Sequence, residues 1–216
     1  VLEQADADQD EPNRVVGLYR NASFARQGGG NNAYNREHVW PRSYGFPDND
    51  ESLNYPFTDM HSLFLSDADY NFARSNHPFD YCDDGCAEYA TVENDGRGDQ
   101  GTGYPGDSNW QTGEFTDGTW EVWSGRRGDV ARALMYMDLR YEGGVHGVSG
   151  AAEPDLVLTD DLQKIRDSYT QENRPTGYMG MLSVLLRWHR EDPVDAAEVQ
   201  HHETVAAWQG NRNPFI

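Results

Sequence analysis

The sequence is poor in lysine, in cysteine and in long apolar runs. Lys164 is the one lysine of the sequence, which has sixteen arginines. Asp and Glu together number 37, so the formal net charge is −20. Such a charge ordinarily argues against a polyanion as partner. An acid-rich, lysine-poor chain is typical of saline habitats, where salt screens the repulsion between carboxylates, and we expect a halophilic or salt-adapted protein. The alternative is an acidic soluble protein without that adaptation.

Apolar runs long enough to span a membrane do not occur in the sequence. A spanning helix needs roughly 20 apolar residues, and the longest apolar windows, such as residues 179–186, are much shorter. A chain of 216 residues can form one domain with a substantial core. We expect an acidic flexible arm over residues 1–13, a single domain over residues 14–216, no membrane association and a monomer.

Cys82 and Cys86 are the two cysteines of the chain. A disulfide can close the small loop between them in an oxidising compartment, and free thiols are the alternative. A zinc site would need four ligands, and the sequence has no second pair of cysteines. The pair therefore favours a disulfide and a protein that is secreted to the extracellular space or the periplasm.

Hydrophobic patterns predict an α+β fold with a largely helical C-terminal half. Residues 128–141, 160–172, 178–191 and 193–209 carry helical spacing or capping residues, and the third segment is apolar enough for a central buried helix. In the front half, the apolar runs at residues 37–40 and 60–65 suit strands, and a helix start follows. Residues 36–76 therefore contain the ingredients of a β-β-α unit.

The segment NREHVW places Glu37 directly beside His38. Adjacent side chains on a strand point to opposite faces, so these two do not naturally share one pocket. If His38 ends the first strand and Asn71 lies one turn into the following helix, Asn71 can approach Glu37. One oxygen from each could then hold a hard cation such as Mg²⁺, with waters completing its shell. His38, on the near side of the cation, would handle a proton.

Four segments carry a family resemblance, in this order: NREHVWPRSYGF, DMHSLFLSDADYNFARSN, GDVARALMYMDLRYEGG, and WHREDPVD with the terminal QGNRNPFI. Together they resemble the endonuclease I family of secreted bacterial nucleases, whose site is a ββα-metal, or His-Me finger, motif. The resemblance implies His38 as general base, with Glu37 and Asn71 as ligands of Mg²⁺, or of Mn²⁺ or Ca²⁺ at the same site. It also implies sequence-nonspecific hydrolysis of DNA, and often of RNA, to 5′-phosphate products.

Some members of that family place an arginine against the scissile phosphate, and Arg42 and Arg74 are the candidates for this catalytic role. Arginine pairs with phosphate oxygens even where salt weakens point charges, so a local positive groove could hold DNA on an acidic protein. The arginines expected to bind substrate there are Arg36, Arg126 and Arg127, in a cluster with Arg42, Arg74 and Arg132. We expect about half of this cluster to form structural ion pairs instead.

His61 is expected to support the site from a strand rather than to bind the metal. Two acidic loops, residues 48–52 and 93–99, are candidates for an additional structural Ca²⁺, although neither completes the pattern of a calcium-binding loop. Two other functions remain open: a nucleic-acid-binding or adhesion module on a degenerate nuclease scaffold, and a calcium-stabilised enzyme acting on polysaccharides. The presence of Glu37, His38 and Asn71 argues against the first.

Overall fold

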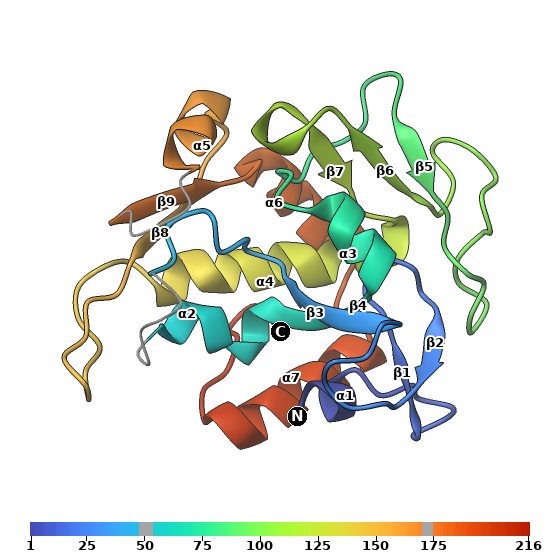
Figure 1. Cartoon of the computed structure of the whole chain (residues 1–216), viewed down its shortest axis with the longest axis horizontal. Coiled ribbons are helices and arrows are strands. Elements are labelled where there is room, and N and C mark those ends of the chain that lie inside the picture. The colour runs from blue at the N-terminus through green and yellow to red at the C-terminus, as the bar shows by residue number, and fades with distance from the viewer. Residues whose placement is uncertain (48–53, 170–174) are drawn as a thin grey trace.

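The computed structural model describes residues 1–47, 54–169 and 175–216 (Figure 1). Its helices are α1 (Leu2–Ala5), α2 (Tyr55–Thr58), α3 (Ala68–Arg74), α4 (Arg127–Arg140), α5 (Leu162–Ser168), α6 (Leu182–Glu191) and α7 (Ala196–Gln209). Its strands are β1 (Arg14–Val16), β2 (Ser23–Ala25), β3 (Tyr34–His38), β4 (Leu63–Asp67), β5 (Ala87–Tyr89), β6 (Asn109–Thr112), β7 (Thr119–Glu121), β8 (Asp155–Leu158) and β9 (Thr176–Met179). Short 3₁₀ turns are η1 (Met60–Ser62), η2 (Phe115–Asp117) and η3 (Ser124–Arg126).

The strands of the described residues form four small sheets around the long helix α4 (Figure 1). β1 pairs with β2, β3 pairs with β4, and β6 lies between β5 and β7, all antiparallel, whereas β8 and β9 are parallel. This mixture of small sheets and helices confirms the α+β class. β3, β4 and α3 follow one another as the β-β-α unit that the sequence predicted.

α4 is the most deeply buried helix of the core. Val130, Leu134 and Met137 are fully enclosed, and small or apolar residues cover most sides of the helix. α4 packs closely against α6 and β8. The sequence had suggested that the segment containing α6 is the central helix, which is wrong, because only Leu185 and Trp188 of α6 are buried. The charged residues of α6 give it a solvent-facing side.

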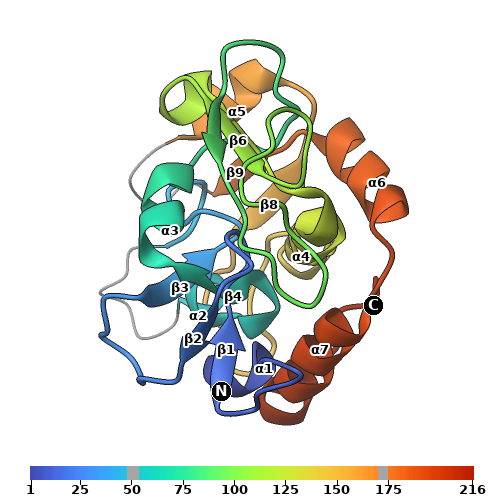
Figure 2. The same cartoon turned by 90° about the vertical axis from the view of Figure 1, so that its right-hand side faces the viewer.

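The first residues of the chain pack onto its last helix. α1 lies beside α7 in both views (Figures 1 and 2). Ala5 is 1% exposed, and the Asp6 carboxylate lies 2.5 Å from Nδ1 of His201 on α7. Asp6 also accepts a hydrogen bond from the backbone N–H of Leu65 on β4. Residues 1–13 therefore differ from the flexible arm that we expected, because α1 buries apolar surface and Asp6 anchors it.

Cys82 and Cys86 form a disulfide bond, as expected. The bond closes the turn that precedes β5. Within the described parts of the chain, no helix combines the length and the apolar character needed to cross a membrane.

Candidate active site

The pairing of β3 with β4 sets the directions of Glu37 and His38. Glu37 lies opposite Phe64 in the antiparallel register, and His38 lies opposite Leu63. Because side chains alternate along a strand and cross-strand partners share a face, Glu37 and His38 point to different faces of the ribbon. β3 ends at His38, which is the condition that the metal-site hypothesis set.

Glu37 is buried on the face that α3 covers. It is 2% exposed, and its Oε1 accepts a hydrogen bond from the Tyr19 hydroxyl at 2.7 Å. The Nη1 atom of Arg74 lies 3.0 Å from the same oxygen. Burial raises the pKa of Glu37, while Arg74 and the Tyr19 hydroxyl oppose that shift by favouring the carboxylate. The two partners thus hold the carboxylate in one orientation through one of its oxygens.

Asn71 is fixed at the edge of β3 by two hydrogen bonds. α3 begins after Asp67, whose carboxylate accepts from the N–H groups of the first turn. One turn later, the Asn71 amide nitrogen donates to Asn35 Oδ1 at 2.6 Å and to the Arg36 carbonyl at 3.0 Å. Arg36 precedes Glu37, so the Asn71 side chain lies against the backbone next to Glu37. Its amide oxygen is the group left for another partner.

His38 is held as a neutral imidazole with a defined tautomer. Its Nε2 lies 2.9 Å from the carbonyl oxygen of Phe57, and its ring stacks on the Phe57 ring at a centroid distance of 4.7 Å. A carbonyl only accepts hydrogen bonds, so Nε2 carries the proton and Nδ1 keeps a free lone pair. Burial lowers the pKa of His38 to about 4; the Phe57 bond opposes this shift, and Arg36, Arg42 and Arg74 add to it. The imidazole is therefore unprotonated at neutral pH.

The donor set around Glu37 and Asn71 fits a hard divalent cation. Glu37 Oε2 and Asn71 Oδ1 accept no hydrogen bond from any described residue. Both are oxygen atoms, which Mg²⁺ prefers, and Mg²⁺ usually takes only one or two protein carboxylates or amides and keeps several waters. No group of three or more His, Cys, Asp or Glu side chains in the described residues could form a protein-only cage. These two oxygens would thus hold the cation with water as the remaining ligands.

Arg74 does not fit the role of an arginine that contacts substrate. It is 0% exposed, and besides Glu37 its guanidinium donates to the carbonyl oxygens of His38 and Val39. These bonds connect α3 to the end of β3. Arg74 is therefore a structural brace behind the site, and this correction leaves Arg42 as the candidate for the phosphate contact.

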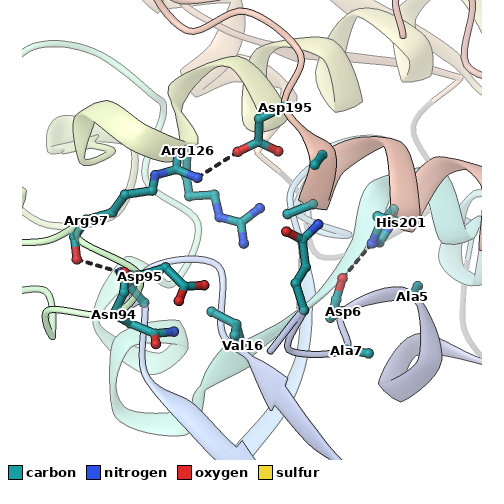
Figure 3. A pocket seen from close by; sticks show the side chains of 14 residues that line it. Ala5, Asp6, Ala7, Val16, Asn94, Asp95, Arg97, Arg126, Asp195 and His201 are labelled. Carbon is teal, nitrogen blue, oxygen red and sulfur yellow. Dashed lines mark hydrogen bonds and ion pairs between the residues drawn. The ribbon is translucent and has the colours of Figure 1, made fainter. Parts of the chain in front are cut away.

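Four of the six clustered arginines form ion pairs with carboxylates. Besides Arg74, these are Arg126 with Asp129, Arg127 with Glu121, and Arg132 with Glu198. The expected substrate contacts from Arg126 and Arg127 are therefore not supported, because burial and pairing engage both guanidinium groups. Arg126 also lines a pocket of about 270 Å³ that includes Asp6, Asp95 and Asp195, acidic surroundings that disfavour a phosphate (Figure 3).

Arg36 and Arg42 are exposed, and neither makes an ion pair with a described residue. The guanidinium of Arg36 lies over the Phe57 ring, 5.8 Å from its centroid, and so stands on the His38 side of the ribbon. Both arginines contribute to the low pKa of His38. Of the six arginines expected to line a positive groove, these two therefore remain as candidates to bind substrate.

His61 is buried away from the three central residues. It lies in η1 rather than in a strand, and its Nε2 bonds the carbonyl oxygen of Asn211 at 3.1 Å. Its ring packs beside Tyr136 and His202. No described contact joins it to Glu37, His38 or Asn71, so the expected support is indirect: the neighbouring Ser62 carbonyl accepts from Val39 N–H at the end of β3.

The two acidic loops give different outcomes. Residues 48–52 lie outside the described residues. In residues 93–99, the Asp99 carboxylate accepts hydrogen bonds from Thr102, Ser108 and the backbone of Gly101 and Asp107. The loop is thus ordered by its own hydrogen bonds, and additional structural Ca²⁺ there stays a prediction.

Phe57 and Tyr19 are site residues that the sequence reasoning missed. Phe57 sets the tautomer of His38 through a backbone carbonyl, which any residue type could supply. Tyr19 reaches Glu37 from a loop 18 residues earlier in the chain. Neither contact has a local sequence pattern, although an aromatic residue in the segment between the two strands was a signal for Phe57.

Comparisons with known proteins find a family and two relatives that match this chain. The family described as "Endonuclease I" matches residues 4–216. A protein of Bacillus amyloliquefaciens named "Extracellular ribonuclease" is 38% identical over 218 residues, and one of the same name from Bacillus subtilis (strain 168) is 37% identical over 218 residues. Each similarity covers 100% of this chain and 62% of the relative. The chain thus spans less than two thirds of the length of these relatives.

Proposed function

Because the chain belongs to the endonuclease I family, we propose that it is an extracellular, metal-dependent endonuclease that hydrolyses phosphodiester bonds of RNA as well as DNA without sequence preference. The names of the two ribonuclease relatives support RNA as a substrate. The same names, with the Cys82–Cys86 disulfide, support an extracellular location. The observation that carries the proposal is the orientation of His38, whose Nε2 is engaged by Phe57 and whose Nδ1 has no hydrogen-bond partner among the described residues.

His38 supplies the base for hydrolysis. A water molecule at Nδ1 loses a proton to the neutral imidazole and attacks phosphorus in line with the departing 3′ oxygen. The Phe57 carbonyl stabilises the imidazolium that results, because it accepts the Nε2 proton throughout. A water nucleophile needs no 2′-hydroxyl, and this is why the same site suits DNA and RNA.

Glu37 and Asn71 would hold the cation, and Arg42 would orient the phosphate. A divalent cation at this position would neutralise charge that builds on the phosphate and would stabilise the leaving oxygen. Arg74 keeps the Glu37 carboxylate aligned and connects α3, which carries Asn71, to the end of β3. Arg42 is exposed and can approach a phosphate from solvent.

Cleavage assays with analysis of the product ends test this function. RNA and plasmid DNA should both be cut with Mg²⁺ or Mn²⁺, neither should be cut in EDTA, and all products should carry 5′-phosphates. Products with 2′,3′-cyclic phosphates, or undiminished cleavage in EDTA, would contradict the mechanism. Repeating the assay over a range of salt concentrations tests salt adaptation: activity that is highest at roughly 0.5 M salt or above supports it, because ordinary nucleic-acid enzymes lose affinity steeply there.

A further inference from the structure

Phe72 stands out on the surface beside the candidate active site. Its side chain is 86% exposed, and it belongs to neither hydrophobic cluster of the core. A single exposed apolar residue is common on protein surfaces and needs no function by itself. Phe72 differs from other exposed aromatic residues in its position, because it directly follows Asn71 on α3.

The geometry of α3 places the Phe72 ring on the solvent side of Asn71. Successive helical residues are rotated by about 100°. Tyr70 and Arg74 point inward, toward the Ala90 carbonyl and Glu37 respectively. Asn71 lies at the boundary, where its amide reaches the edge of β3. Phe72 therefore points into solvent beside Asn71, and the two Cα atoms are about 3.8 Å apart.

The surface that joins Phe72 to the site is suited to a nucleic-acid strand. Asn35, whose Oδ1 accepts from the Asn71 amide, is exposed on β3; Arg36 is exposed on the same strand with its side chain on the His38 side, and Arg42 is exposed beyond the end of the strand. Proteins hold single strands by combining cations that hold phosphates with aromatic rings that stack on bases. Stacking on an aromatic ring tolerates any base, which agrees with a nuclease without sequence preference.

We propose that Phe72 stacks on an unpaired nucleobase beside the candidate active site, and so makes the protein favour single-stranded over double-stranded nucleic acid. In a duplex both faces of each base are covered by neighbouring bases, so the ring finds a free face only on an unpaired base. The inference rests on the proposed function in that nucleic acid is the ligand. It adds the residue that selects the strand state.

Binding in EDTA tests the inference without turnover. The probes are a fluorescein-labelled RNA without self-complementarity, the same RNA annealed to its complement as a blunt duplex, and a chain of the same length in which every base is replaced by an abasic residue. By fluorescence anisotropy, Phe72→Ala should raise the Kd for unpaired RNA roughly 5- to 150-fold, the usual range for one stacked base. The Kd values for the duplex and for the abasic chain should not change.

Matched variants separate stacking from a general surface effect. Phe72→Tyr and Phe72→Trp should keep the wild-type Kd, whereas Phe72→Leu should behave like Phe72→Ala. Phe115→Ala removes another exposed phenylalanine, 53% exposed on η2, and should leave every Kd unchanged. All variants should melt at the wild-type temperature, because the rings lie in solvent.

Three results would overturn the inference. These are an unchanged Kd for unpaired RNA in Phe72→Ala, an equal loss on the abasic chain, and an equal loss on the blunt duplex, which would indicate a wedge into a duplex instead. Cleavage distinguishes this failure from that of the proposed function. RNA that binds through Phe72 but is never cut with Mg²⁺ or Mn²⁺ refutes the nuclease activity alone, whereas cleavage with no dependence on Phe72 refutes the stacking alone.

Discussion

His38 and His201 are two histidines of one molecule whose surroundings shift their pKa values in opposite directions. Around His38, burial lowers the pKa to about 4, and the nearest charged groups are arginines. Around His201, burial also lowers the pKa, but the ion pair with Asp6 outweighs it and the net shift is upward. The comparison shows that the neighbouring charges decide which histidine can accept a proton at neutral pH.

The two histidines also differ in their contacts. His201 pairs with Asp6, and its ring stacks on Phe64 of β4 at a centroid distance of 4.3 Å. His38, at the end of β3, has the ring and the carbonyl of Phe57 as neighbours and makes no ion pair with a carboxylate of the described residues. A carboxylate partner thus raises the pKa of His201, and His38 lacks such a partner in the described parts of the chain.

Removal of His38 should have the largest effect on activity. In His38→Ala, the water nucleophile loses its base, and the cleavage rate should fall roughly 10²- to 10⁴-fold while the fold persists. Initial rates on RNA and DNA with Mg²⁺, together with a thermal melt, measure both parts. His201→Gln is the matched control and should cleave at close to the wild-type rate once folded. Wild-type turnover in His38→Ala would show that another group is the base.

Removal of Arg74 should have the largest effect on stability. Arg74→Ala leaves Glu37 as an unpaired buried carboxylate, which should reduce the free energy of unfolding by about 3–5 kcal/mol. Arg42→Ala, on the surface, should change that free energy by no more than about 0.5 kcal/mol and should instead weaken substrate binding. Urea unfolding of both variants makes the comparison. Similar stability for the two would mean that Arg74 is not the brace that its contacts indicate.

The ion pair of His201 should make the stability of the protein depend on pH, and this effect should be smaller than that of removing Arg74. A histidine whose folded pKa is raised contributes stability that is fully present below the unfolded pKa of about 6.5 and is lost as pH rises through the folded pKa. The difference in unfolding free energy between wild type and His201→Gln should therefore shrink as pH rises above about 6.5, by about 1.4 kcal/mol per unit of raised pKa. Urea titrations at several pH values measure it. A difference that grows with pH would contradict the ion pair with Asp6.

The β-β-α unit could be predicted because its signals are local. Short apolar runs indicated β3 and β4, and the polar residues before α3 indicated a helix start, which Asp67 caps. That His38 ends β3 was a condition of the metal-site hypothesis, because the apolar run at residues 37–40 would carry the strand past His38. Local patterns therefore located the candidate ligands and the base.

The roles of the arginines could not be predicted in the same way. Arg132 and Glu198 are 66 residues apart in the chain, and Arg74 and Glu37 belong to different elements. Which arginine finds a buried carboxylate depends on tertiary packing, and no spacing in the sequence reports it. The sequence likewise could not show that Arg36 and Arg42 are the exposed arginines of this cluster, because that depends on which arginines pair with carboxylates in the folded chain.

Metal affinity measured beside turnover tests the central claim most directly: Glu37 and Asn71 hold a cation, while His38 takes a proton from the water that attacks the same phosphate. Mn²⁺ binding followed by isothermal titration calorimetry should be weakened roughly tenfold or more in Asn71→Ala and unchanged in His38→Ala, although both variants lose cleavage. If His38→Ala loses Mn²⁺ as strongly as Asn71→Ala does, His38 is itself a ligand and this division of roles is wrong.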